Sequence, residues 1–202
     1  MDISVTYERD WGVGWIAPEP AFMQRASHAL AHDGGVWLVD PVDGDGLEER
    51  IARLGEVRGV LQLLDRHGRD AAALARRHGV PLLETPFDRV AGAPFEPIAV
   101  LCRPRWSETA LWWPEPRALV VADALGTAPY FTAPGRALGV HPMLRLTPPR
   151  ALAGRDPEHL LVGHGRPLHG PGVAAAVRDA IEGSRREIPR WLAGLPAARR
   201  RR

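Results

Sequence analysis

Lysine and asparagine are absent from this chain of 202 residues, and cysteine occurs once, at Cys102. A single cysteine excludes an internal disulfide framework and any zinc site built from several cysteines. A metal bound by this chain would therefore need histidine and carboxylate ligands. All 26 basic residues are arginines, a bias that is typical of GC-rich coding and carries little functional weight.

Long apolar runs are missing as well. No window approaches the roughly 18 apolar residues of a membrane-spanning helix, and the charged start MDISVTYERD does not resemble a secretory signal. We therefore expect no membrane partner and a cytoplasmic location. The apolar content of 45% and the formal charge of +2 fit one compact domain. The sequence predicts that domain over residues 1–188, followed by an arginine-rich tail over residues 189–202.

The near-neutral charge also argues against a nucleic-acid-binding protein. The exception is the basic run at residues 199–202, and a terminal run of this kind is usually solvated and frayed. Binding through counterion release normally needs a broader basic surface, so we do not expect nucleic acid as a partner. No P-loop or Gly-x-Gly-x-x-Gly turn supports nucleotide binding, and no Gly-x-Ser-x-Gly motif supports a serine nucleophile.

Short apolar runs alternate with helical patterns, which is typical of an α/β protein. A helix over AAALARRHG should end at Gly79 and Pro81, and Pro189 should end or kink a late helix over residues 173–188. Residues 124–150 have no clean period, and we expect a long loop there with room for one short helix. The other elements are expected as strands at 36–39, 57–64, 97–101, 109–113, 118–121 and 160–162, and as a helix at 47–54.

Polar side chains follow three of these strands, where α/β proteins usually place ligands and catalytic groups. We therefore expect one shared pocket. Histidine and aspartate together are the ligands of hydrolytic zinc, iron or manganese sites, in which the metal acidifies a bound water. Each cluster alone is more often structural, as a turn or a helix cap. The side chains are Asp65, His67, Arg69 and Asp70 after the second strand, Asp123 after 118–121, and His164 after 160–162.

Taken in order, the clusters resemble the metallo-β-lactamase superfamily. Its members carry Thr-His-x-His-x-Asp-His after a strand, then a Gly-His turn, a Gly-Asp and a late Gly-His-Gly. Here LLDRHGRDAAALARRHGVP is similar to the first motif, VVADALG to the Gly-Asp strand end, and LLVGHGRPLHGPGVAAAVRDAI to the late histidine turn and helix, while VWLVDPVDG is similar to the early strand and loop. The resemblance covers roughly residues 26–188. It implies a four-layer αββα sandwich with the pocket at one edge of the two sheets.

The chain departs from this motif at several positions. Asp65 stands at the first histidine, Arg69 at the aspartate and Asp70 at the final histidine, although both aspartates could still coordinate. Trp106 takes the histidine position of the middle turn. Three of the seven expected ligands are present by identity: His67, Asp123 and His164.

The role of Arg69 separates two hypotheses about the function of this chain. A guanidinium cannot ligate a cation and repels a neighbouring one, so we do not expect two metals. In the hypothesis we favour from the sequence, Arg69 pairs with Asp123, Asp70 or both, the metal centre is degraded, and the chain is a non-catalytic or vestigial protein. It would then bind a small molecule or a protein in a pocket that includes Arg69, Asp70 and Trp106.

The alternative is a hydrolase of ester, thioester or related bonds that uses a single divalent metal, either zinc, manganese or iron. Its metal ligands would come from four residues: Asp65, His67, Asp123 and His164. The remaining histidines are expected to have structural roles. His141 and His169 lie in turns rich in glycine or proline, His78 precedes a helix end, and His28 and His32 lie in a segment that could be extended.

Overall fold

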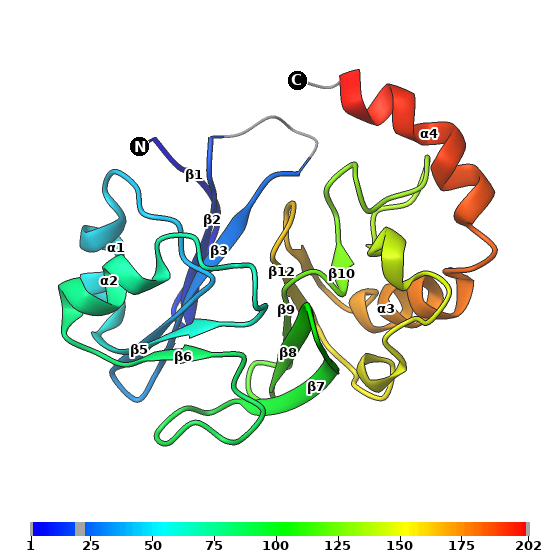
Figure 1. Cartoon of the computed structure of the whole chain (residues 1–202). Coiled ribbons are helices and arrows are strands. Elements are labelled where there is room, and N and C mark those ends of the chain that lie inside the picture. The colour runs from blue at the N-terminus through cyan, green and yellow to red at the C-terminus, as the bar shows by residue number, and fades with distance from the viewer. Residues whose placement is uncertain (1, 19–22, 201–202) are drawn as a thin grey trace.

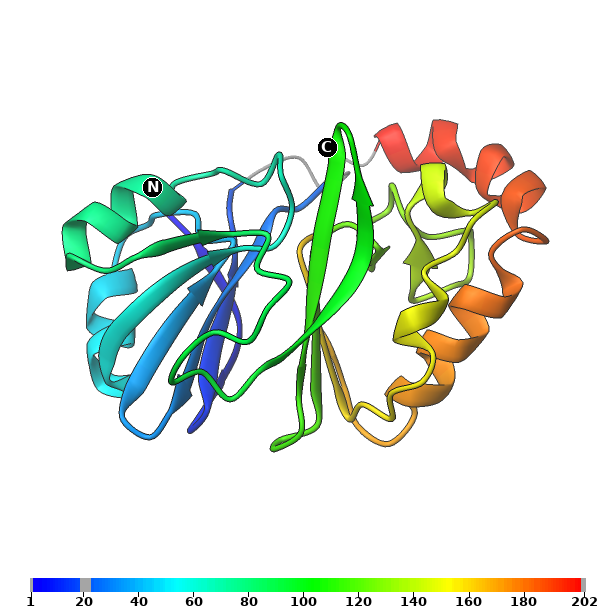
Figure 2. The ribbon, with the colours of Figure 1, turned by 60° about the horizontal axis from the view of Figure 1, so that its bottom comes forward.

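The computed structural model describes residues 2–18 and 23–200. Two β-sheets face each other in the middle of the molecule, and helices cover the outer face of each sheet (Figure 1). Figure 2 shows α1 and α2 outside the first sheet, and α3 and α4 outside the second. This arrangement confirms the predicted four-layer αββα sandwich.

The first sheet contains six strands in chain order. Neighbours from β1 to β4 are antiparallel, while β5 runs parallel to β4 and β6 runs parallel to β5. The strands are β1 (Ser4–Arg9), β2 (Gly12–Ile16), β3 (Ala26–His32), β4 (Gly35–Val39), β5 (Glu56–Gln62) and β6 (Leu82–Glu84).

The second sheet has the strand order β13-β12-β9-β8-β7, and β9 and β12 are parallel. A separate two-stranded ribbon, β10-β11, lies between this sheet and the late helices. The strands are β7 (Glu96–Arg103), β8 (Trp106–Trp113), β9 (Ala118–Val121), β10 (Leu125–Gly126), β11 (Gly139–Val140), β12 (His159–Val162) and β13 (Leu168–His169).

The helices follow their apolar spacing. In α1, Leu47 and Ile51 lie four residues apart and are buried against the first sheet. Gly79 ends α2 in the left-handed conformation, with φ of 66°, which glycine adopts without strain. The helices are α1 (Leu47–Leu54), α2 (Ala71–His78), α3 (Val173–Gly183) and α4 (Ile188–Arg200), with short 3₁₀ helices at Pro142–Leu144 and Arg150–Leu152.

Two apolar clusters hold the layers together. The larger one lies between the sheets and extends to α3, and it includes Leu61, Trp113 and Val177. The smaller one packs α1 and α2 against the first sheet around Trp15 and Leu38. Burial of this apolar surface is what fixes the sheets face to face, so that their strand ends meet at one edge.

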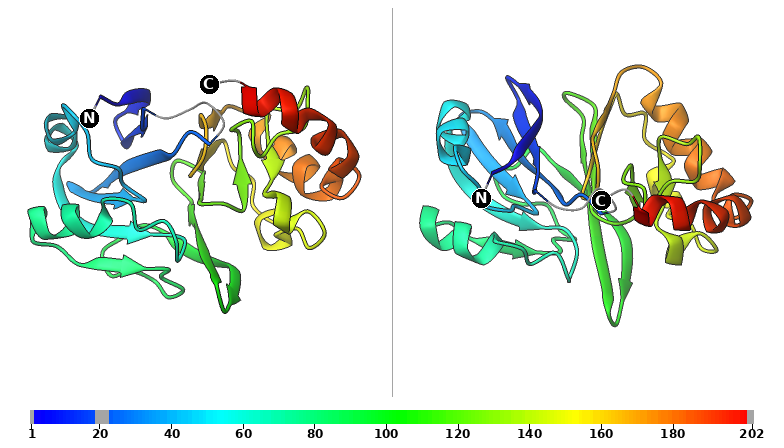
Figure 3. Two further views of the ribbon diagram at one scale, coloured as in Figure 1. Left: turned by 45° about the horizontal axis from the view of Figure 1, so that its top comes forward. Right: turned by 90° about the horizontal axis from the view of Figure 1, so that it is seen from above.

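The carboxyl-terminal part of the chain differs from the sequence expectation. The late helix ends at Gly183, and Pro189 lies in the first turn of α4, where a missing N–H costs no hydrogen bond. Most of the expected tail is therefore helical (Figure 3), while Arg201 and Arg202 lie outside the described residues. The long loop predicted over residues 124–150 also contains β10 and β11. Within the described ranges, no helix is long and apolar enough to cross a membrane.

Candidate metal centre

Three side chains from separate parts of the chain meet where β5, β9 and β12 end. They are His67, Asp123 and His164, all of them buried. The Oδ1 atom of Asp123 lies 3.2 Å from Nε2 of His67 and 3.2 Å from Nε2 of His164, and the two Nε2 atoms are 3.3 Å apart. The structure therefore brings together the three side chains that match the motif by identity.

The size of this triangle fits one metal ion. Zinc bonds of about 2.0 to 2.1 Å at tetrahedral angles place neighbouring ligand atoms roughly 3.3 Å apart. The observed separations of 3.2 to 3.3 Å match one face of such a tetrahedron. Asp123 Oδ1 is also buried without a hydrogen-bond donor from the described residues, as expected for an atom that ligates a cation.

The contacts of the far nitrogens fix the tautomer of each imidazole. Nδ1 of His67 lies 2.8 Å from a carboxylate oxygen of Asp40, and Nδ1 of His164 lies 2.9 Å from the carbonyl oxygen of Met23. Since an ionised carboxylate and a carbonyl can only accept, each Nδ1 carries the proton. In its neutral form, each imidazole then presents the Nε2 lone pair to Asp123, and this is the form that binds metals.

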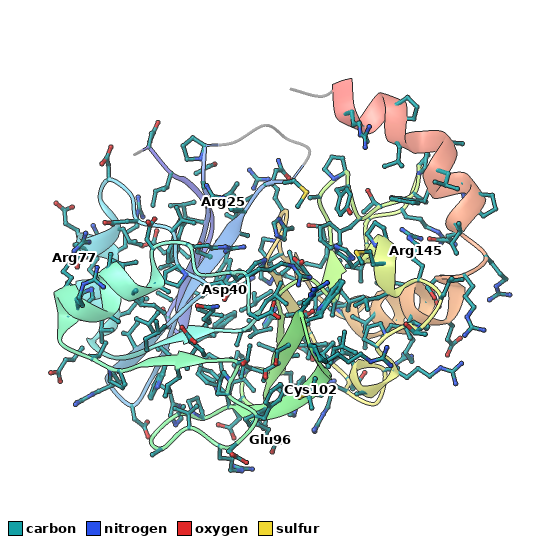
Figure 4. The ribbon with its side chains drawn as sticks, in the orientation of Figure 1. Arg25, Asp40, Arg77, Glu96, Cys102 and Arg145 are labelled. Atoms are coloured by element: carbon teal, nitrogen blue, oxygen red, sulfur yellow. The ribbon has the colours of Figure 1, made fainter. Side chains whose placement is uncertain are left out.

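Asp40 was not among the candidate site residues, although it follows a buried strand as Asp123 does. It is buried directly after β4 (Figure 4), and it also accepts a hydrogen bond from the main-chain N–H of Leu63 at 2.8 Å. Burial alone would raise the pKa of Asp40, but its contact with His67, the charge of Arg69 and the N–H of Leu63 outweigh burial and lower the pKa. Asp40 therefore stays ionised and orients His67.

The hydrogen bonds of Arg69 differ from those expected. Its guanidinium donates to the main-chain carbonyl oxygens of Ala26, Asp40 and Gly163. From the sequence, we expected the carboxylate of Asp123, Asp70 or both as its partner. Asp123 forms an ion pair with a different arginine, Arg66, whose Nη2 atom lies 3.5 Å from Oδ2 of Asp123.

Comparison by sequence finds no match, either among protein-family models or among curated proteins. Comparison by structure, in contrast, finds similar proteins. The metallo-β-lactamase FIM-1 from Pseudomonas aeruginosa, in a mono-zinc form, superposes with a TM-score of 0.59 at 12% identity, covering 92% of this chain and 97% of that one. A metallo-β-lactamase from Erythrobacter litoralis superposes with a TM-score of 0.58 at 13% identity, covering 89% of this chain and 92% of that one. A metallo-β-lactamase from Pontibacter korlensis superposes with a TM-score of 0.59 at 10% identity, covering 90% of this chain and 99% of that one.

This chain has the metallo-β-lactamase fold. The comparisons extend over about nine-tenths of the chain, so the fold includes both sheets and the edge where the three ligand atoms meet. Identities of 10 to 13% establish the fold alone, and the chemistry has to be argued from the site.

Two aspartates of the candidate set are directed elsewhere in this metallo-β-lactamase fold. Asp65 accepts a hydrogen bond from the main-chain N–H of Ser107 at 2.9 Å and from Arg66 at 3.2 Å. Asp70 directly precedes α2 and accepts the N–H of Asp43 at 2.9 Å. Among the described residues, neither belongs to the group of ligand atoms that lie within 4.8 Å of one another.

Trp106 forms part of the wall beside the triad. Its indole N–H donates to Glu108 at 3.0 Å, and the guanidinium of Arg66 stacks on its ring with 4.1 Å to the centroid. The other oxygen of Glu108 accepts the main-chain N–H groups of Asp123 and Ala124 at 2.9 and 2.7 Å. Burial raises the pKa of Glu108 to about 7. Trp106 and Glu108 thus fix the turn that carries Asp123.

His141 is a neighbour of the site that sequence reasoning assigned to loop packing. Its Nδ1 accepts the main-chain N–H of Met143 at 3.2 Å, so the neutral ring carries its proton on Nε2, 4.0 Å from Oδ2 of Asp123. Burial lowers the pKa of His141 to about 4, which keeps the ring neutral. Its edge-to-face contact with Trp106 encloses the site further, and only the three-dimensional path of residues 124–150 reveals it.

Proposed function

We propose that this chain is a hydrolase that uses one divalent metal ion, held by His67, Asp123 and His164. The observation that carries the proposal is the triangle of ligand atoms with sides of 3.2 to 3.3 Å. Two imidazole nitrogens and one carboxylate oxygen form a donor set that suits zinc, iron or manganese. The mono-zinc form of FIM-1, which this chain resembles in fold, supports a site with one ion.

When bound, a divalent ion would supply a Lewis acid and an acidified water for attack on a carbonyl carbon. Residues of the chain prepare the place for it. Asp40 holds the proton on Nδ1 of His67, and the carbonyl of Met23 holds the proton on Nδ1 of His164. Phe131 is fully buried and stacks on the His164 ring, with 5.5 Å between the ring centroids, and it thereby limits access of bulk water. An ester, thioester or related bond of a small molecule is the substrate class that this chemistry suits.

A second candidate function is a metal-free binding protein, and two observations favour it. Arg66 lies 3.5 Å from Asp123 and already balances part of its charge. Burial and Arg69 lower the pKa of His67, but Asp40 and Asp123 outweigh them and raise it above the usual value. A protonated His67 would then replace the metal as the counter-charge, and the pocket would bind a small molecule or a protein without catalysis.

Metal content separates the two candidates. We would measure it by elemental mass spectrometry on untagged protein, purified without chelator and again after incubation with zinc, manganese and ferrous iron. The hydrolase proposal expects one metal ion per chain, lost in His164→Gln. His159→Gln is the matched control, because His159 begins the strand β12 whose other end His164 follows. Protein that stays metal-free under all conditions would contradict the proposal and favour the binding protein.

Activity is the second measurement. Protein loaded with the metal found above would be tested on nitrophenyl esters and on thioesters, with His164→Gln and His159→Gln in parallel. The proposal expects hydrolysis by the unaltered chain and by His159→Gln, and none above background by His164→Gln. Hydrolysis that persists in the metal-free His164→Gln variant would show that the activity does not come from this site.

A further inference from the structure

We infer that Arg69 is a positioning residue of the metal centre: its guanidinium ties together the main-chain segments that hold His67 and His164 and thereby sets the affinity for the metal. The inference rests on the proposed metal site. It assigns Arg69 a different role from that of a counter-ion to the site carboxylates.

The guanidinium reaches both sheets. Nη1 donates to the carbonyl oxygen of Ala26, at the start of β3, and to that of Asp40, after β4, at 2.7 Å. Nη2 donates to the carbonyl oxygen of Gly163, after β12, at 2.9 Å. A single side chain therefore joins the first sheet to the second at the edge where the ligands meet.

Each of these segments bears on a ligand. Gly163 directly precedes His164, and its carbonyl oxygen also accepts the N–H of Ala26 at 2.8 Å. Asp40 is the residue whose carboxylate orients His67. Displacement of either segment would change a side of a triangle whose edges are 3.2 to 3.3 Å, and a metal ion tolerates little deviation from its bond lengths.

Arginine suits this position because its planar fork offers donors in several directions from one rigid group. A lysine ammonium presents its donors from one atom. The backbone of Arg69 has φ of 41°, a left-handed conformation that costs a residue other than glycine about 1 kcal/mol or more. A glycine at this position would keep the backbone conformation and remove the side chain with its guanidinium.

The experiment is therefore a cobalt(II) titration of the whole chain, followed by visible absorption, which reports both affinity and ligand geometry. We expect Arg69→Gly to bind cobalt(II) about 10- to 100-fold more weakly than the unaltered chain, with shifted absorption bands. Propylguanidinium added at millimolar concentration should restore affinity and bands toward those of the unaltered chain. Restoration by the missing group separates positioning from a general loss of stability.

Arg185→Ala is the matched control. Arg185 also donates twice to a main-chain carbonyl, that of Leu146 at 2.9 and 2.6 Å, but it lies in the turn between α3 and α4. This variant should melt at a lower temperature and bind cobalt(II) as the unaltered chain does. An Arg69→Gly variant with unaltered affinity and spectrum would overturn the inference.

The other outcomes are equally decisive. An unaltered chain that binds no cobalt(II) would overturn both the proposed metal site and this inference, whereas normal binding by both the unaltered chain and Arg69→Gly would overturn the inference alone. If circular dichroism shows that Arg69→Gly does not fold, Arg69→Lys provides the same test. Weaker binding with altered bands by folded Arg69→Lys supports the inference, and unchanged binding overturns it.

Discussion

Replacing Asp40 with asparagine tests how the chain prepares His67 for a metal. The carboxylate has two buried hydrogen-bond partners at 2.8 Å, Nδ1 of His67 and the main-chain N–H of Leu63. Both partners are donors, and a carboxylate satisfies both at once. An amide has one accepting and one donating end, so asparagine can satisfy only one of them.

Either orientation of the amide is unfavourable. With its oxygen toward Leu63, the NH₂ group faces Nδ1 of His67 and drives the imidazole proton to Nε2, the atom that faces Asp123. With its oxygen toward His67, the NH₂ group faces the N–H of Leu63, and a buried donor left without an acceptor costs about 1 to 3 kcal/mol. Loss of such a supporting contact typically lowers metal affinity about 10- to 100-fold, which is roughly 1.4 to 2.8 kcal/mol.

The assay is competition for zinc between the protein and a chromophoric chelator. Asp70→Asn is the matched control, because Asp70 also accepts a main-chain N–H, that of Asp43 at 2.9 Å, and no hydrogen bond of it to His67 or His164 is present in the described part of the chain. We expect Asp40→Asn to weaken zinc binding and Asp70→Asn to leave it unchanged. Equal zinc affinities for Asp40→Asn and the unaltered chain would refute the argument that Asp40 fixes the proton of His67.

His67→Ala and His164→Ala should each abolish the rise in melting temperature on adding zinc, measured by differential scanning fluorimetry, and a zinc-dependent rise that survives both would exclude these ligands. Trp106→Phe removes the indole donor to Glu108, 3.0 Å away, and should lower the free energy of unfolding by roughly 1 to 3 kcal/mol in urea titrations, with Trp112→Phe as the control. Burial lowers the pKa of His28 from 6.5 to about 4, so the folded state excludes a proton that the unfolded state binds. Stability should therefore fall as the pH drops from about 6.5 to 4, by roughly 3 kcal/mol from this residue, and His28→Gln should lack that part of the loss; parallel pH profiles would contradict the assignment.

Much of the fold could be predicted because many strands and helices from residue 35 to 121 bury a continuous or periodic apolar face. Leu47 and Ile51 of α1, for example, lie one helical turn apart and are both buried. From the sequence, we did not predict β1 and β2, and we left the segment of β3 open, because ASHALAH consists largely of small residues that suit a helix as well as a strand. Pro189 was interpreted as the end or a kink of a late helix, although proline is also favoured in a first turn.

The ligands could be predicted because His67, Asp123 and His164 each follow a strand. Asp40 carried the same signal, a polar residue directly after the buried run VWLV, and could have been found in this way. His141 could not, because it reaches the site through a segment without periodicity. For Arg69, the charge of the side chain is known from the sequence, but its acceptors are not. They are three main-chain carbonyl oxygens from two sheets, and every residue type has such an oxygen.

The positions of the protons on His67 and His164 distinguish a metal site from a metal-free pocket. With Nδ1 of both histidines protonated by their far contacts, any hydrogen bond from Nε2 to Asp123 requires an imidazolium. One imidazolium, at His67, leaves the lone pair of His164 facing the same carboxylate oxygen at 3.2 Å. Two imidazoliums would place like charges 3.3 Å apart beside Arg69, in a site with little water to screen them. A single divalent cation satisfies all three atoms at once without either conflict, which is why the geometry favours the metal.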